Sequence, residues 1–179
     1  MSRSIPAWQI GGFLFVAVLG TLLHFLFDWS GGSIGAALLS AVNESIWEHM
    51  KLIYVPMLAF AWIEYSVFGK TVSSFWCIKL AGFLTALLLI PVIYYVYTGI
   101  GGISASWFNV TIFFLAAGIA MYRETRLFQK GRTCIIPGRL ALGLILLIGI
   151  LFIFLTFLPP RIPLFLDPVT QSYGYQRYP

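Results

Sequence analysis

The stretch LALGLILLIGILFIFLTFL, residues 140–158, decides the fold class of this chain. It contains no charged side chain, and a helix of this length crosses the hydrocarbon layer of a bilayer, which is about 30 Å thick. Four further apolar stretches of comparable length lie upstream, at residues 8–27, 46–67, 75–98 and 107–122. The sequence therefore predicts an all-α integral membrane protein with five transmembrane helices in one domain, 1–179, ending in a tail at residues 159–179.

The composition excludes several other classes of protein. Of the 179 residues, 60% are hydrophobic and only 9% are charged, whereas soluble domains are about 25% charged. An ordinary cytosolic enzyme, a nucleic-acid-binding module and a disordered tail are therefore excluded. The formal net charge of +5 is spread along the chain, so it predicts no nucleic-acid partner. The positions of the basic residues instead indicate the orientation in the membrane. We expect a multi-pass protein of the cell membrane whose partners are membrane lipids.

Basic residues in short loops predict the orientation, because cytoplasmic loops carry an excess of lysine and arginine. Most of them fall on one predicted side: Arg3, Lys70, Lys79, Arg123, Arg126, Lys130, Arg132 and Arg139. The amino terminus is therefore predicted to be cytoplasmic and the carboxyl terminus extracytoplasmic. The first apolar stretch is longer than a usual signal-peptide core, so we expect it to remain as a span.

The two cysteines fall on the predicted cytoplasmic side. Cys77 opens the third predicted helix and Cys134 lies in the basic loop between the last two helices. Thiols stay reduced in the cytoplasm, and neither cysteine has the spacing of a metal or redox motif. The sequence therefore predicts no disulfide.

Most of the acids and both histidines gather on the opposite, extracytoplasmic side. Ionisable groups at membrane depth cost at least a few kcal/mol each, so they usually face a cavity or one another. In the first predicted helix, His24 and Asp28 stand four residues apart and share one helical face. Gly20, one turn below, allows another helix to approach closely.

The densest polar run is NESIWEHMK, residues 43–51, at the start of the second predicted helix. On a continuous helix, Glu44, Glu48 and Lys51 would share one face, with His49 turned about 100° away. Two acids one turn apart repel each other unless a cation, a proton or a lysine lies between them. Lys51 is therefore the expected partner of Glu48.

The tail is too rich in proline to form a regular helix. Its residues Leu164, Phe165 and Leu166 are too apolar to remain in water. We expect the tail to fold back over the extracytoplasmic face of the bundle. This would bring Asp167 and Tyr173 towards the other polar residues.

Three of these features together resemble an uncharacterised family of small prokaryotic membrane proteins, which carries only a domain-of-unknown-function label. They are the His24 helix, the run at 43–51, and the tail with Asp167-Pro168 and Tyr173-Gly174. The most specific part is Asn-Glu-Ser-x-Trp-Glu-His. The resemblance covers most of the chain and implies one domain, but it transfers no activity and no catalytic residue.

The polar run has a purely structural explanation. Ser45-x-x-Glu48 has the spacing of a capping box, and an acid in the first turn suits the helix dipole. Trp47 would then be an aromatic anchor at the membrane interface. Capping does not explain why Asn43, Glu44 and His49 crowd the same place.

A metal or acid–base site is the alternative explanation. Imidazole with carboxylate is a normal ligand set for zinc, and for iron or manganese with more carboxylate, although the His-Glu-x-x-His spacing is absent. The candidate metal ligands, also the candidate catalytic residues, are His24, Glu44, Glu48 and His49. Without a metal, Glu48 and His49 would act as general acid and base with His24 or Asp28. The candidate binding residues are Asn43, Trp47, Lys51, Asp28, Asp167 and Tyr173.

Three classes of function stay open on the sequence alone. The leading hypothesis is a membrane-embedded enzyme acting on a lipid-like or isoprenoid substrate, with a divalent metal such as zinc as the candidate cofactor. The second is a small proton- or cation-coupled transporter or channel subunit, which would have to oligomerise. The third is an anchoring or assembly protein with an open polar surface. At the cytoplasmic ends, Glu64 and Lys79 are expected either to form an ion pair or to extend their charged groups to the membrane surface.

Overall fold

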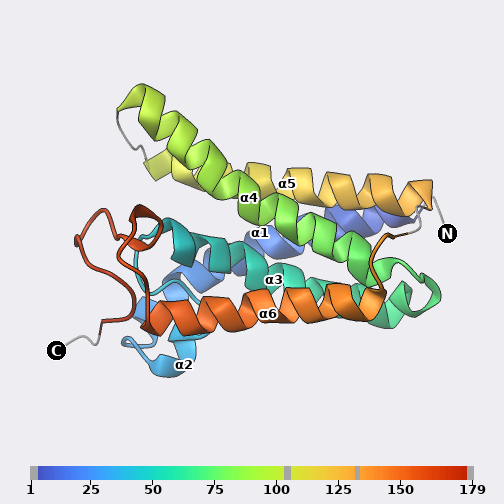
Figure 1. Ribbon diagram of the computed structural model, residues 1–179, viewed down its shortest axis with the longest axis horizontal. Coiled ribbons are helices and arrows are strands. Elements are labelled where there is room, and N and C mark those ends of the chain that lie inside the picture. The colour runs from blue at the N-terminus through green and yellow to red at the C-terminus, as the bar shows by residue number, and fades with distance from the viewer. Residues whose placement is uncertain (1–3, 103–105, 132–133, 177–179) are drawn as a thin grey trace.

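The computed structural model describes residues 4–102, 106–131 and 134–176 and contains no strand within them. Five long helices run along the long axis of the molecule, and each reverses the direction of the one before it (Figure 1). The long helices are α1 (Ile5–Trp29), α3 (Ile46–Val67), α4 (Phe75–Gly101), α5 (Ser106–Lys130) and α6 (Gly138–Phe157). The short elements are α2 (Ile34–Ala37) and two 3-10 turns, η1 (Gly69–Thr71) and η2 (Pro163–Phe165).

Within the described residues, four helices are long and apolar enough to cross a membrane: α1, α3, α4 and α6. The predicted bounds of α3 are confirmed at both ends. The predicted end of the fourth long helix at Tyr122 is wrong, because α5 continues to Lys130. The reason is tertiary: Glu124 is buried against Lys79 of α4, and Arg123 donates a hydrogen bond to Thr85 Oγ1 on the same helix.

Small residues let α1 pack closely against its neighbours. A Cβ atom at Gly20 would lie 2.5 Å from Phe113 Cζ and 2.8 Å from the Leu52 carbonyl oxygen. At Gly12, a Cβ atom would lie 2.5 Å from the Phe60 ring. Such distances are far inside van der Waals contact, so α1 packs against α3 and α5 only because these positions lack a side chain. The predicted close approach at Gly20 is confirmed.

The buried pair expected between Glu64 and Lys79 is also confirmed. Lys79 Nζ lies 2.6 Å from Glu64 Oε2. The same ammonium lies 2.5 Å from Glu124 Oε2 on α5, and Gln9 on α1 donates to Glu64 Oε1 at 2.6 Å. The ion pair predicted between two helices is therefore part of a cluster whose side chains come from four helices.

The prediction of two reduced cysteines is wrong in this structure, because Cys77 and Cys134 form a disulfide. Their Cα atoms lie 6.3 Å apart although the residues are 57 positions apart in sequence. This separation is within the range that a disulfide spans. Antiparallel packing brings the start of α4 next to the segment before α6, and spacing along the chain could not reveal that proximity.

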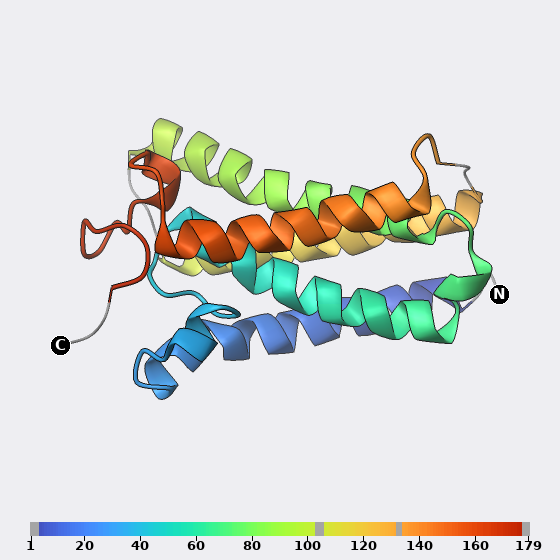
Figure 2. The same ribbon diagram turned by 60° about the horizontal axis from the view of Figure 1, so that its bottom comes forward.

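At the other end of the bundle, the tail folds back as expected. The backbone N–H of Tyr175 donates to the Thr156 carbonyl at 2.8 Å, and the Tyr175 hydroxyl donates to the Gly32 carbonyl at 3.2 Å. Leu166 and Tyr173 form an isolated antiparallel bridge within the tail. Figure 2 shows the tail and α2 at the same end as the start of α3, so this end is covered by irregular chain.

Candidate metal centre

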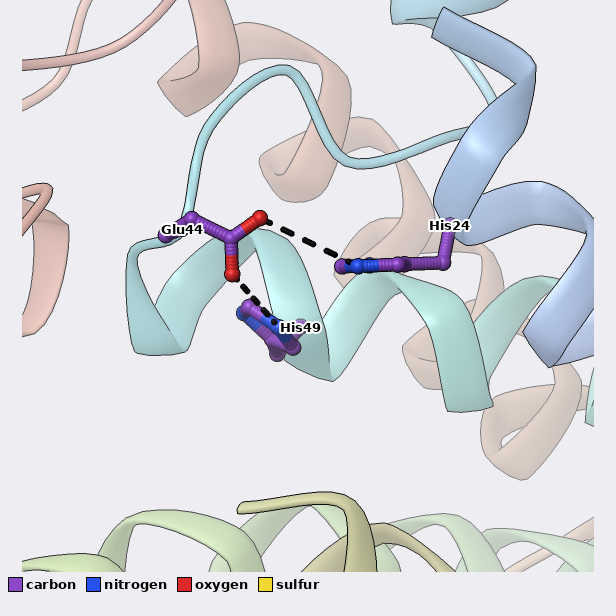
Figure 3. Close-up of side chains that lie close together, drawn as sticks. All are labelled: His24, Glu44 and His49. Atoms are coloured by element: carbon purple, nitrogen blue, oxygen red, sulfur yellow. Dashed lines mark ion pairs between the residues drawn. The ribbon is translucent and has the colours of Figure 1, made fainter. Parts of the chain in front are cut away.

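Three potential metal ligands from two helices and one loop converge at the tail end of the bundle. His24 comes from α1, Glu44 from the loop before α3, and His49 from the first turns of α3 (Figure 3). His24 Nε2 lies 3.9 Å from Glu44 Oε1, and His49 Nε2 lies 3.5 Å from Glu44 Oε2. One ligand atom from each residue falls within 4.8 Å of the others.

The start of α3 explains why Glu44 and His49 face each other. Ser45 is the N-cap, and its hydroxyl accepts a hydrogen bond from the Glu48 N–H at 3.4 Å. Asn43 Oδ1 accepts from the Ser45 N–H at 2.9 Å. Glu44 therefore precedes the helix, and the predicted face shared by Glu44 and Glu48 does not exist. The capping prediction is confirmed for Ser45 only. In a capping box, the N-cap N–H donates to the side chain of the acid three residues later, here Glu48, whereas in this structure it donates to Asn43.

A backbone contact fixes the tautomer of His49. Its Nδ1 lies 2.9 Å from the Ser45 carbonyl oxygen. Because a carbonyl oxygen only accepts, Nδ1 carries the proton in this contact. In the neutral ring, Nε2 then presents its lone pair towards Glu44. Metal-ligating histidines in proteins are oriented by the same kind of outer hydrogen bond.

Donor atoms bound to one tetrahedral zinc at about 2.0–2.2 Å lie about 3.3–3.6 Å from each other. The contacts of 3.5 and 3.9 Å from Glu44 to the two histidines are made by different carboxylate oxygens. One ligand atom from each residue lies within 4.8 Å of the others, so the cluster is wider than a metal-bound site. Two imidazoles and one carboxylate match the ligand set of catalytic zinc sites, which leave one position open to water or substrate.

Glu48 and Lys51 belong to a different, buried network. Lys51 Nζ lies 2.6 Å from Glu48 Oε2, and both side chains are 1% exposed. The Thr156 hydroxyl on α6 donates to Glu48 Oε1 at 2.7 Å, and Lys51 donates to the Ala37 carbonyl at 2.8 Å. The predicted Glu48–Lys51 partnership is confirmed. The structure places this pair between α3, α6 and the segment around α2, and it does not bring Glu48 to the histidines.

The remaining candidate binding residues mostly hold the covering segments in place. Asn43 Nδ2 donates to the Gly174 carbonyl at 3.1 Å and so ties the loop before α3 to the tail. Asp167 is buried and accepts from the Val169 N–H and the Thr170 hydroxyl. Tyr173 lies in the bridge with Leu166.

Trp47 lies where the start of α3 meets α6 and the tail. Its ring packs between Phe152 of α6 and Phe165 of the tail, with centroid distances of 4.6 and 4.7 Å. The indole is therefore part of the contact that holds the tail on the bundle. The expected role of Trp47 as an interfacial anchor stays a prediction.

A polar cavity of 330 Å³ lies under the tail and reaches the histidine–glutamate cluster. Its polar lining comes from α1, the loop before α3 and the tail. These polar residues are His24, Asp28, Asn43, Glu44, Asp167, Thr170, Ser172 and Gln176. Asp28 and Asp167 thus lie in the same cavity as the cluster, as the sequence suggested.

An apolar groove of 260 Å³ meets the same cluster from the side of α5. The residues lining both this groove and the polar cavity are His24, Phe25 and Glu44. The rest of the groove is lined mainly by apolar and small residues of α1, α3 and α5: Gly20, Thr21, His49, Leu52, Asn109, Val110, Phe113 and Phe114. The cluster therefore stands where a polar and an apolar compartment meet.

Sequence reasoning missed the contribution of α5 to this site. Asn109 and Phe113 line the groove and also a smaller cavity of 40 Å³ that includes His49 and Tyr94. The only available signal was an asparagine in an apolar helix. A uniformly apolar helix shows no periodicity that would indicate which of its faces meets α1.

Comparison with known proteins identifies a family but no activity. Neither the curated proteins nor the solved structures contain a significant match to this chain. The family model described as a family of unknown function, DUF6512, matches residues 1–175. The chain therefore belongs to DUF6512, a family of unknown function.

Proposed function

We propose that this protein is a membrane-embedded, metal-dependent enzyme that acts on a lipid-like substrate. The observation that carries the proposal is the position of the His24–Glu44–His49 cluster, at the junction of a polar cavity and an apolar groove. A histidine with only a structural role does not require a polar cavity and an apolar groove beside it. An enzyme that acts on an amphiphile needs a polar cavity for the head group and an apolar groove for the chain.

The cluster would hold a divalent metal of the zinc class through His24 Nε2, His49 Nε2 and a Glu44 oxygen. A metal with an open position polarises a substrate oxygen or lowers the pKa of a bound water. Asp28 lines the same polar cavity and is our candidate for moving a proton to or from the reacting group. The hydrogen bond from His49 to the Ser45 carbonyl would keep the ligand nitrogen aimed at the metal.

The substrate would be an amphiphile with a small uncharged or cationic head group. Its chain would lie in the groove beside Gly20 and Phe113, which faces the space between α1 and α5. Its head group would lie in the polar cavity, whose described lining includes three carboxylates and neither lysine nor arginine. An anionic head group would be repelled there unless it bound the metal directly.

The proposed placement in the membrane is five spans with the amino terminus in the cytoplasm. The alternating direction of five long helices supports an odd number of crossings, with the termini at opposite ends (Figure 1). The basic segment between α5 and α6 supports a cytoplasmic position for the end opposite the cluster. The disulfide lies at that same end, and disulfides are more typical of an oxidising compartment.

The decisive experiment is elemental analysis of protein purified in detergent without chelators, beside His24→Ala, His49→Ala and Glu44→Gln. We expect about one equivalent of zinc, iron or manganese in the wild type and a loss of most of it in each variant. Asp28→Asn is the matched control, because it alters a carboxylate of the same cavity outside the cluster. Metal-free wild-type protein that is folded, or metal retained in all three variants, would refute the metal centre.

Proton- or cation-coupled transport is the second candidate function. It is favoured by one observation: a second buried polar cluster, around Lys79, lies at the opposite end of the bundle. A transporter would show substrate-dependent proton or cation flux in liposomes. An enzyme would show turnover in detergent micelles with no gradient.

A further inference from the structure

The cluster around Lys79 joins four helices and is closed to solvent. Gln9 of α1 is 2% exposed, and Glu64 of α3, Lys79 of α4 and Glu124 of α5 are each 0% exposed. It lies at the amino-terminal end of the bundle, far from the proposed metal centre along the helices (Figure 1). Nothing in the proposed enzyme mechanism uses it.

The charges of this cluster do not balance. Glu64 and Glu124 both contact the single ammonium of Lys79, through one carboxylate oxygen each. Arg123, the neighbouring residue on α5, donates instead to Thr85 at the exposed surface. A second buried pair among the described residues, Glu48 with Lys51, has one acid for one base. With both carboxylates ionised, the Lys79 cluster would bury one uncompensated negative charge, which is strongly unfavourable.

The hydrogen bonds locate the imbalance on one carboxyl group. Both oxygens of Glu64 have donors: Gln9 Nε2 for Oε1 and Lys79 Nζ for Oε2. Glu124 Oε2 has Lys79, but Glu124 Oε1 is buried with no donor, and so is Gln9 Oε1. The described carboxyl oxygen of this cluster that lacks a donor therefore belongs to Glu124.

The missing side chain at Gly82 leaves room for the Glu124 carboxyl. Glu124 Oε1 packs on the backbone of Gly82 so closely that a Cβ atom added there would lie 1.9 Å away. Gly82 thus gives Glu124 room to reach Lys79.

We propose that this cluster is a proton-binding site in which the Glu124 carboxyl holds one proton in the folded protein. The proton lies on Glu124 Oε1, and Oε2 accepts from Lys79. The proton neutralises the excess charge of the cluster. The site is independent of the metal centre and would be retained if that centre bound no metal.

Glu124→Gln tests the proposal, because glutamine imitates a protonated glutamate in shape, charge and hydrogen bonding. Glu48→Gln is the matched control, since it removes one charge from the balanced pair. Infrared spectra of the detergent-solubilised proteins should show a protonated-carboxyl carbonyl band at neutral pH in the wild type and in Glu48→Gln. Glu124→Gln should lack this band yet unfold at nearly the wild-type denaturant concentration, whereas Glu48→Gln should be clearly destabilised.

The pH dependence of unfolding provides a second readout. Unfolding of the wild type would release one proton more than unfolding of Glu124→Gln over a limited pH range. That range begins at about pH 5, where a solvated glutamate is ionised, and ends where the buried carboxyl would itself ionise. The unfolding equilibrium constant of the wild type should therefore rise with pH more steeply than that of Glu124→Gln, by up to about tenfold per pH unit. The stability of the wild type thus falls as pH increases. Equal slopes, an unchanged infrared band, or a Glu124→Gln variant as unstable as Glu48→Gln would overturn the proposal. Wild-type stability that requires sodium would also overturn it, in favour of a bound cation.

Discussion

Glu44 and Glu48 are two acids one helical turn apart in sequence, yet they have entirely different surroundings. Glu44 is half exposed and faces two histidines. Glu48 is buried, with Lys51 and Thr156 as partners. Their different environments arise because α3 begins between them, with Ser45 as its cap. The position of one N-cap therefore separates a candidate ligand from a structural ion pair.

This separation predicts opposite phenotypes for the two acids. Glu44→Gln should lose bound metal with little change in stability, because a half-exposed side chain has few contacts to lose. Glu48→Gln should leave Lys51 buried without an anion and cost about 3–5 kcal/mol of unfolding free energy, while the folded fraction retains its metal. Elemental analysis and denaturant unfolding of both variants measure the two effects, and metal loss in folded Glu48→Gln would contradict the assignment.

Replacing both members of the buried pair should be far better tolerated than replacing one. In Glu48→Met with Lys51→Met, no charge remains in the apolar interior, and the side chains keep similar volume. Most of the stability lost in Glu48→Gln should return, although the Ala37 carbonyl and Thr156 lose partners. A double variant as unstable as the single one would show that the hydrogen bonds, and not the charges, matter most.

At the scale of the helices, glycine positions set how closely the elements pack. Gly20→Ala would force a methyl group to 2.5 Å from Phe113 and 2.8 Å from the Leu52 carbonyl. We expect a loss of about 1–3 kcal/mol, as is typical of overpacking, together with a change in the apolar groove. Gly11→Ala is the control, since a Cβ atom there meets nothing within 4 Å. Unfolding of the two variants should differ clearly, and equal stabilities would refute the packing account.

At the scale of the whole molecule, labelling of single cysteines tests the proposed orientation in the membrane. In a Cys77→Ser, Cys134→Ser background, Gln171→Cys places one thiol in the exposed part of the tail, and Lys130→Cys places one at the opposite end. With the proposed orientation, a membrane-impermeant maleimide added to intact cells labels only the Gln171→Cys protein. The reverse labelling pattern would put the basic segment and the disulfide outside and the candidate metal centre inside.

The sequence by itself determined the features that depend on local physics. The length of an apolar run predicts a helix suited to a membrane, and the bounds of α3 matched at both ends. Ser45 was predictable as a cap, and Gly20 as a point of close helix contact. Lys51 was predictable as the partner of Glu48 because the two are separated by a single helical turn.

The tertiary structure alone decided which distant residues meet. Glu124 and Gln9 join the Lys79 cluster, and Cys134 meets Cys77, across separations that no spacing rule covers. In the same way, the groove beside His24 exists because Phe113 of α5 packs on Gly20. The physical reason is that the lipid-facing and the buried residues of an apolar helix are equally hydrophobic. The sequence therefore does not show how the helix is rotated about its axis. Hydrophobic length is therefore encoded locally, whereas the choice of contacting faces emerges only when the helices pack.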